Sequence, residues 1–178
     1  MTANTDNLGP LLEAPEAYLD LRRSLRNGLG YPDERRPLLI GIDGADGSGK
    51  SSLAAWLSWQ MEIPALHLDV YVVRDSDPLS WCYDDLRRAI EGAQSGGRRP
   101  VLVEGVLLLH VLEQINRTPE FLVFVERHEH EPGMREHLAS YLASYRPMER
   151  ADYLLRWSSA EYDARVRQAH LAKWGMDQ

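Results

Sequence analysis

Short apolar runs alternate along the chain with longer segments whose apolar residues recur at helical spacing. The runs predict buried strands at residues 37–43, 65–72, the start of 101–109, 121–126 and 152–157. The longer segments predict helices at residues 10–30, 51–61, 80–97, 132–146 and 159–174. Strands that alternate with helices are typical of βαβ units and of a parallel sheet covered on both faces. We therefore expect an α/β fold of three layers with a mostly parallel five-stranded sheet.

The chain length and the absence of repeats predict one domain. A chain of 178 residues is long enough for one compact domain with a sizeable core. The sequence has no internal repeat and no low-complexity segment. We expect residues 1–178 to form a single domain in which residues 1–30 are a tail and a helix.

Composition and charge exclude several classes of protein. Apolar residues make up 44% and charged residues 26% of the chain, which is typical of soluble domains. The formal net charge of -7 gives no general attraction to nucleic acid or to an anionic membrane. The single cysteine, Cys82, and the absence of a signal-peptide pattern favour a cytoplasmic protein. The oligomeric state is left open, and a homodimer is compatible with the sequence.

Residues 44–51, GADGSGKS, match the phosphate-loop pattern G-x-x-x-x-G-K-[ST]. Glycines allow successive backbone N–H groups to face one cluster of phosphate oxygens, and the helix that follows adds the positive end of its dipole. Lys50 is expected to reach the β- and γ-phosphates, and the Ser51 hydroxyl to bind Mg²⁺. An ordinary glycine-rich turn is the alternative, but the strand before and the helix after favour a site for ATP and Mg²⁺. The predicted ATP-binding residues are Gly44, Ala45, Asp46, Gly47, Ser48, Gly49, Lys50, Ser51 and Ser52.

Two acidic residues lie in the second and third predicted strands: Asp69 ends HLD and Glu104 ends VLVE. Parallel sheets place ligands at the carboxyl ends of their strands, so Asp69 and Glu104 are expected beside the phosphates. Asp69 could accept the proton of an attacking hydroxyl, and Glu104 could hold Mg²⁺ directly or through water. The alternative for Asp69 is an ordinary turn residue at a strand end. An acid on an apolar strand is costly to bury without a partner, which favours a function for Glu104.

Four segments together resemble the uridine kinase–phosphoribulokinase group of small-molecule kinases, which also includes nicotinamide riboside and pantothenate kinases. The resemblance covers about residues 37–157. The segments that carry it are IGIDGADGSGKSS, LHLDVY, VLVEGVLLL and YRPMERADYLL. The last of them matches a P-x-x-x-A-D tail, here Pro147, Ala151 and Asp152. The phosphate loop is specific for its superfamily only, whereas the order of the four segments indicates the kinase group.

The resemblance implies roles for particular residues. Asp69 falls on the catalytic acid of the family, Ser51 on the metal-binding hydroxyl, and Glu104 on the Glu-Gly after the third strand, so all three become candidate metal ligands. Residues 80–86, SWCYDDL, are similar to a segment near the acceptor site. The alternative for that segment is an ordinary helix start capped by Ser80. The candidates for substrate contact are Asp69, Tyr71, Trp81, Tyr83, Asp84 and Glu104.

A lid is also implied by the resemblance, at residues 127–146. Arg127 and Arg135 are the best matches to the family's arginines that clamp the transferred phosphate. The sequence departs from the family in two ways: Val70 stands where many members have a second acid, and the lid is short and lacks closely paired arginines. The pair His128 and His130 has a spacing that can bind metal, but a solvated lid turn is the preferred interpretation.

The favoured function is an ATP-dependent kinase that phosphorylates a hydroxyl of a small metabolite, such as a nucleoside, a sugar or a vitamin alcohol. The predicted catalytic residues are Asp69, Lys50, Arg127 and Arg135. The alternative is a non-catalytic ATP-binding regulator descended from such a kinase, which Val70 and the short lid suggest. A GTPase is disfavoured because the sequence has no Asn-Lys-x-Asp segment to read guanine.

Overall fold

Five parallel strands form the centre of the molecule in the order β2-β3-β1-β4-β5. The computed structural model describes residues 15–30, 35–76, 78–95, 99–128, 135–158, 160 and 164, and side chains except those of 135 and 136. The strands are β1 (Leu39–Gly44), β2 (Ala65–His67), β3 (Val101–Gly105), β4 (Phe121–His128) and β5 (Tyr153–Ser158). The helices are α1 (Glu16–Leu29), α2 (Lys50–Met61), α3 (Tyr83–Gln94), α4 (Leu108–Gln114), α5 (Arg135–Tyr145) and α6 (Pro147–Arg150), with a 3-10 turn η1 (Leu68–Tyr71).

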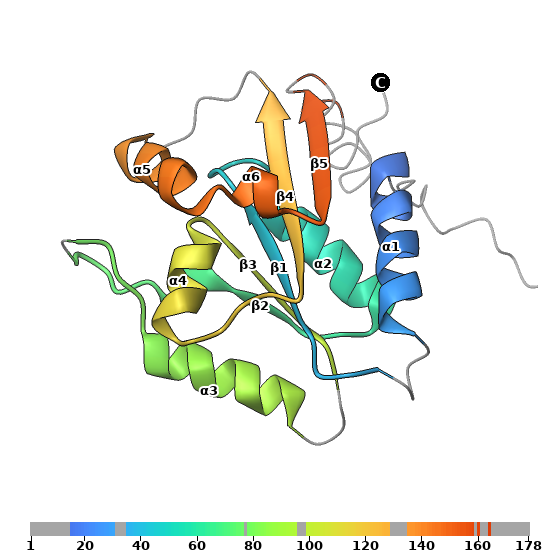
Figure 1. Cartoon of the computed structure of the whole chain (residues 1–178), viewed down its shortest axis with the longest axis horizontal. Coiled ribbons are helices and arrows are strands. Elements are labelled where there is room, and N and C mark those ends of the chain that lie inside the picture. The colour runs from blue at the N-terminus through green and yellow to red at the C-terminus, as the bar shows by residue number, and fades with distance from the viewer. Residues whose placement is uncertain are drawn as a thin grey trace, which may run out of the picture.

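Helices cover both faces of the sheet (Figure 1). Helices α1 and α2 pack on one face, where Leu21 and Leu57 are fully buried. Helices α3, α4 and α5 pack on the other face, around Leu86 and Leu108. The three-layer α/β phosphate-loop fold predicted from the sequence is therefore confirmed.

Strands β1 and β3 have no exposed residue because each is covered on both faces. All of β1 and all of β3 are buried. This explains why their sequences, LIGIDG and VLVEG, are nearly continuous apolar runs rather than alternating ones. It also makes the two acids in these strands, Asp43 and Glu104, exceptional members of the core.

Two apolar runs contain a change of structure that the sequence pattern does not reveal. The run 65–72 is a strand only to His67, and η1 follows it. The run 101–109 leaves the strand after Gly105 and enters α4 through Leu107, whose φ is 55°. Gly105 permits a close approach, because a Cβ there would lie 2.6 Å from the Cβ of Leu68. Apolar runs of this length do not distinguish a strand from a buried helical turn.

Other predicted segments fall partly outside the described residues. For the helix predicted at 159–174, only residues 160 and 164 are described. Within the lid segment 127–146, residues 129–134 lie outside the description, and α5 packs against the core through Leu138 and Tyr141. Across the parts that are described, no helix combines the length and the apolar character that crossing a membrane requires.

Candidate functional site

The glycine-rich loop joins β1 to α2 and has the backbone that the sequence pattern predicts. Gly47 and Gly49 have φ values of 68° and 94°, in the left-handed region that favours glycine. A Cβ on Gly44, which has a φ of 150°, would lie 2.3 Å from the carbonyl oxygen of Val125 on β4. The glycines are therefore required both by the turn and by the packing of the loop against β4.

Helix α2 begins at Lys50, directly after the loop. Its N-cap residue is Gly49, and no side chain caps the first turn. The first turn of the helix contains no acidic residue. An uncapped helix N-terminus next to a glycine loop presents backbone N–H groups and a positive dipole end, which suit an oxyanion.

Three side chains hold the carbonyl groups of this loop. Lys50 Nζ donates to Ala45 O over 2.7 Å and the Trp157 indole N–H donates to Ser48 O over 2.9 Å. Arg127 Nη1 donates to Gly47 O over 3.3 Å. A trans peptide points its N–H opposite to its C=O, so the bond from Trp157 turns the N–H of the next residue away from β5. Sequence analysis assigned no role to Trp157.

Lys50 is buried among carboxylates. Its side chain is only 7% exposed, and burial lowers its pKa. The carboxylates of Glu104, Asp43, Asp46 and Asp69 oppose that shift, in decreasing order of effect. The lysine thus lies in the field of both acids that the sequence placed at strand ends, and a bound polyphosphate would add the charge that best stabilises its ammonium group.

Ser51 and Glu104, two predicted metal ligands, are in direct contact. Ser51 Oγ donates to Glu104 Oε1 over 2.9 Å, and the carboxylate is almost fully buried. His67 Nδ1 lies 2.6 Å from the same oxygen, because β2 and β3 pair His67 with Glu104. The sequence pattern alone did not indicate that His67 lies in the site. Its only signal was its position on the strand before Asp69.

The donor set near Ser51 fits Mg²⁺ bound together with phosphate oxygens. Among the described residues, no three His, Cys, Asp or Glu side chains converge to hold a metal ion by themselves. Mg²⁺ usually takes one or two protein oxygens and completes its shell with phosphates and water. A hydroxyl and a carboxylate 2.9 Å apart beside a phosphate loop match that requirement.

The acceptor-side segment, defined here as residues 68–76 and 78–83, follows β2 and leads to α3. Asp69 lies in η1 with an exposed side chain, and its charge acts on Lys50. Tyr71 is half-buried, and burial followed by the charge of Asp85 raises its pKa. Trp81 is only 4% exposed and forms an isolated antiparallel bridge with Val72. The chain therefore doubles back here and leaves Asp69 at an exposed turn.

The start of α3 corrects one alternative. The helix begins at Tyr83, its N-cap residue is Cys82, and no side chain caps it, so Ser80 is not the cap. The backbone N–H of Ser80 instead donates to Ser76 Oγ over 3.1 Å within the preceding loop. Asp84, a candidate for substrate contact, is exposed and pairs with Arg87 at 2.7 Å. Contact of Tyr83 or Asp84 with a substrate stays a prediction.

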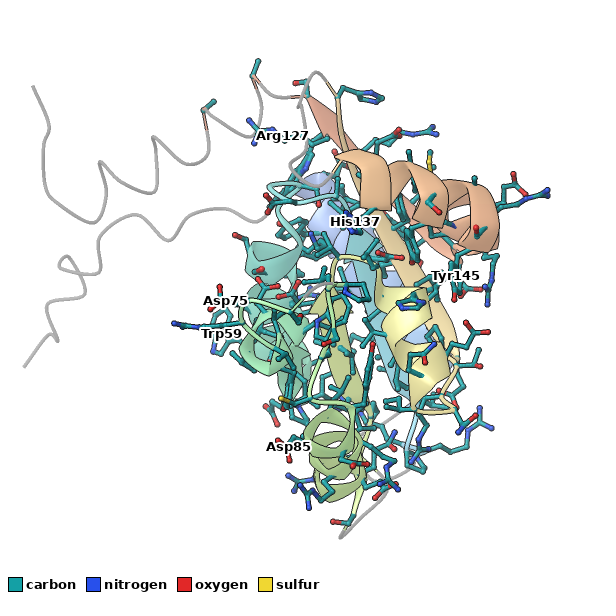
Figure 2. The ribbon with its side chains drawn as sticks, turned by 90° about the vertical axis from the view of Figure 1, so that its left-hand side faces the viewer. Trp59, Asp75, Asp85, Arg127, His137 and Tyr145 are labelled. Carbon is teal, nitrogen blue, oxygen red and sulfur yellow. The ribbon has the colours of Figure 1, made fainter. Side chains whose placement is uncertain are left out.

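The structure describes the side chain of only one of the two predicted lid arginines, Arg127. Arg127 lies near the carboxyl end of β4, and its guanidinium group donates to the carbonyl oxygen of Gly47 in the phosphate loop. Figure 2 shows Arg127 at one end of the molecule and Asp85 of α3 at the opposite end. Arg135 is the first residue of α5, and its side chain lies outside the description. His128 ends β4 with an exposed side chain, and His130 also lies outside the described residues.

Asp43 is a site residue that sequence analysis missed. It directly precedes the phosphate loop, is 1% exposed, and contributes to the charge around Lys50. Burial raises its pKa to about 6, although its hydrogen bonds and the charge of Lys50 lower it. The signal was the one that identified Glu104, an acid near the end of an otherwise apolar strand.

Comparison with known proteins supports the fold. No family model matches the chain, and no curated protein matches it. A solved structure described as a possible uridine kinase from Bacillus stearothermophilus is 17% identical, with a TM-score of 0.54 over 79% of this chain and 97% of that one. A gluconokinase from Sinorhizobium meliloti is 18% identical, with a TM-score of 0.41 over 78% and 96%. At 17% identity, the likeness to the first of these structures shows the fold alone, which is that of the phosphate-loop kinases.

Proposed function

We propose that this protein is an ATP-dependent phosphotransferase that moves the γ-phosphate to a hydroxyl group of a small metabolite. The single observation that carries the proposal is the group of polar residues around Lys50. Lys50 directly follows the glycine loop after β1 and precedes Ser51, which is hydrogen-bonded to Glu104. The charge of Asp69 also acts on Lys50. A phosphate loop alone indicates nucleotide binding, whereas the acids that follow β2 and lie on β3 add what phosphoryl transfer needs. The solved structure described as a possible uridine kinase supports the same choice.

The proposed mechanism depends mainly on positioning and on neutralising charge. Backbone N–H groups of residues 44–51 and the Lys50 ammonium group hold the β- and γ-phosphates. Mg²⁺, when bound with ATP, supplies further positive charge, and Ser51 with Glu104 would hold it. Asp69 accepts the proton of the acceptor hydroxyl and orients that oxygen for in-line attack. Arg127 stabilises the charge on the transferred group.

Lys50 would change partners when nucleotide binds. Its ammonium group now donates to the carbonyl oxygen of Ala45, within the loop itself. Phosphate oxygens are stronger acceptors than a neutral carbonyl, because both donor and acceptor are then charged. The intraloop bond thus keeps Lys50 buried and close to the position at which it would meet the phosphates.

The acceptor is the part of the proposal that needs a direct search. Purified protein with Mg-ATP should be assayed for ADP release against nucleosides, sugars and pantothenate-like alcohols. We expect one class of alcohol to raise ADP release well above the rate with water, and the product to carry one phosphate on that alcohol. A uridine-like acceptor is the first to test, because the four sequence segments resemble the uridine kinase group.

The same assay distinguishes the alternative function. Val70 stands where many related kinases have a second acid, and its side chain is 75% exposed beside Asp69. If the protein binds Mg-ATP with micromolar affinity and transfers phosphate to none of the acceptors, a non-catalytic ATP-binding regulator becomes the better account. Equal affinity for GTP and ATP, measured in a separate binding experiment, would reopen the possibility of a GTPase.

A further inference from the structure

The carboxylate of Asp43 is hydrogen-bonded to the backbone of Gly44, the first residue of the phosphate loop. Asp43 Oδ1 accepts the backbone N–H of Gly44 over 2.7 Å, inside the core. Gly44 is paired in register with Val125 on β4 and lies so close to the carbonyl of Val125 that a side chain would not fit. The first turn of the loop is therefore held between the carboxylate on one side and β4 on another.

The other carboxylate oxygen of Asp43 is held by helix α5. The hydroxyl of Tyr141 donates to Asp43 Oδ2 and accepts the backbone N–H of Leu109 over 3.1 Å. Both the donor and an acceptor site of this hydroxyl are thus used, and Tyr141 is 5% exposed. Burial raises the pKa of the Tyr141 phenol, and the Asp43 charge raises it further, so the hydroxyl keeps its proton for this bond. The bond joins α5 to the loop across the start of α4.

Burying the carboxylate of Asp43 costs free energy. This cost indicates that the hydrogen bonds its oxygens accept have a function. Removing a carboxylate from water without enough partners disfavours its charged form. The groups that offset this cost are Tyr141, the N–H of Gly44, Lys50 and the N–H of Leu108, in that order. An apolar residue of similar size would fill the same space without the penalty, but it could not hold the N–H of Gly44 or the hydroxyl of Tyr141.

We propose that Asp43 and Tyr141 are positioning residues that hold the first turn of the phosphate loop in its phosphate-binding conformation. The inference rests on the proposed use of that loop to bind the phosphates of ATP. Neither residue touches the substrates. Asp43 fixes the first amide of the loop and faces Lys50, while Tyr141 fixes the carboxylate. Losing either group should weaken phosphate binding whichever alcohol is the acceptor.

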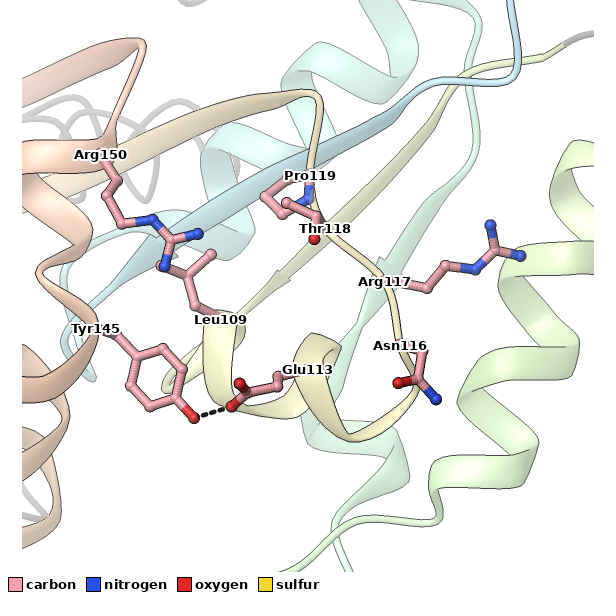
Figure 3. A pocket seen from close by; sticks show the side chains of 8 residues that line it. All are labelled: Leu109, Glu113, Asn116, Arg117, Thr118, Pro119, Tyr145 and Arg150. Carbon is pink, nitrogen blue, oxygen red and sulfur yellow. Dashed lines mark hydrogen bonds between the residues drawn. The ribbon is translucent and has the colours of Figure 1, made fainter.

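Tyr145 provides a matched control one helical turn further along α5. Its ring stacks on that of Tyr141 with centroids 5.1 Å apart, but its hydroxyl donates to Glu113 on α4. The close-up in Figure 3 shows this bond at a cavity of about 360 Å³ that Arg150 also lines. Phenylalanine at position 145 therefore removes the same atom from the same helix and leaves the bond between Tyr141 and Asp43 in place.

The test measures binding of Mg-ADP and of inorganic pyrophosphate by calorimetry, with folding checked by circular dichroism. We expect Tyr141→Phe to weaken both affinities by the same factor, roughly threefold to tenfold, because the lost hydrogen bond acts on the phosphates only indirectly, through Asp43 and Gly44. Asp43→Ala should weaken both at least as much. Asp43→Asn should recover part of the loss, since its amide oxygen can still accept from Gly44. Tyr145→Phe should stay within about twofold of the wild type for both ligands.

The outcomes separate this inference from the proposed function. Wild-type affinity in both Tyr141→Phe and Asp43→Ala would overturn the positioning role while leaving the proposed kinase intact. An equal loss in Tyr145→Phe and Tyr141→Phe would also overturn it, because a general loosening of α5 would then explain both. A wild-type protein that binds neither ligand would contradict the proposed function itself, and the positioning role with it.

Discussion

The phosphate loop and the acceptor-side segment both lie at the carboxyl ends of the strands, but they are built in opposite ways. The loop is held by Lys50, Arg127, Trp157 and Asp43, and two of these side chains come from other strands. The acceptor-side segment turns between β2 and α3 and exposes several of its side chains. A loop held by several side chains suits the phosphates of ATP, which do not change from one kinase to another. An exposed segment can vary in sequence between kinases that act on different acceptors.

The difference also explains where charge is buried. Around the loop, Lys50, Asp43 and Glu104 are all buried, and the charges of both carboxylates act on Lys50. On the acceptor side, the Asp84–Arg87 and Asp85–Arg88 pairs lie on the outer surface of α3. Exposed pairs of this kind contribute little to stability. Substitutions at the loop should therefore change the free energy of unfolding, whereas substitutions on the acceptor side should matter mainly for the proposed catalysis.

The largest effect is expected at Asp69, the residue of the acceptor-side segment that we propose accepts the proton of the acceptor hydroxyl. Asp69→Asn should lower kcat by roughly 10²–10⁴-fold, since the amide cannot accept the proton of the acceptor. The affinity for Mg-ADP should change much less, because the charge of Asp69 acts on Lys50 more weakly than the charges of Glu104, Asp43 and Asp46. Initial rates with the identified acceptor and calorimetry with Mg-ADP provide the two measurements.

Asp75→Asn is the matched control for that variant. Asp75 is exposed in the same segment and has a φ of 58°, a conformation that asparagine tolerates. Its kcat should equal that of the wild type. Full activity in Asp69→Asn, or an equal loss in Asp75→Asn, would remove Asp69 from the reaction.

The second effect is a pH-dependent cost of the buried Asp43 carboxylate. The pKa of Asp43 is about 6 in the folded protein and 3.8 when the group is free, so the folded state binds more protons between these values. Stability therefore falls as the pH rises through this range and levels off above it. The pKa shift corresponds to a loss of unfolding free energy on the order of 3 kcal/mol between low and high pH.

Asp43→Asn should remove that cost. Relative to the wild type, the variant should gain stability steadily between pH 4 and pH 7, as measured by urea unfolding at each pH. The exposed Asp75→Asn variant serves as the control. A stability difference between Asp43→Asn and the wild type that does not change with pH would show that Asp43 is not buried as described.

The third effect concerns the bond from β5 to the loop. Trp157→Phe leaves the carbonyl oxygen of Ser48 without its donor, and an unsatisfied buried group costs about 1–3 kcal/mol of unfolding free energy. The affinity for Mg-ADP should fall as well, because the peptide that Trp157 orients belongs to the loop. Urea unfolding and calorimetry measure the two effects.

Trp56→Phe separates packing from the hydrogen bond. Trp56 packs against Tyr18 with ring centroids 5.2 Å apart, on the same face of the sheet as Trp157. Its loss should lower stability without changing the affinity for Mg-ADP. A nucleotide affinity that falls equally in both variants would show that the indole N–H of Trp157 has no special role.

The smallest effect is expected at Val70, whose side chain is 75% exposed. Val70→Ser should change the unfolding free energy by less than about 0.5 kcal/mol, as is usual for exposed positions. Thermal unfolding followed by circular dichroism is sufficient to measure it. A much larger loss of stability would mean that the acceptor-side segment is packed as firmly as the loop, and the contrast between the two regions would fail.

The sequence predicted the regions in which a local pattern determines the structure. The glycine positions of the phosphate loop follow from backbone geometry, and the apolar runs of β1 and β3 follow from burial on both faces. The pattern did not predict the end of β2, because an apolar run continues through η1.

Contacts between residues that are far apart in the sequence could not be predicted, for a different reason. Asp43 meets Tyr141 across 98 positions and Ser48 meets Trp157 across 109, so each pair depends on the completed fold. Tyrosine and tryptophan at these positions look like ordinary core residues in the sequence. An acid next to the loop was the one visible signal, and its significance depended on knowing that β1 is buried on both faces.

The most direct test of the central claim is the affinity for Mg-ATP of the wild type and of Lys50→Met. Methionine keeps most of the aliphatic length of the buried side chain and removes the ammonium group, with its charge and its hydrogen-bond donors. We predict micromolar binding by the wild type and a loss of roughly 10- to 100-fold in the variant, since a hydrogen bond between charged groups contributes about 1.5–3 kcal/mol. Equal affinities would contradict the claim that residues 44–51 bind the phosphates of ATP.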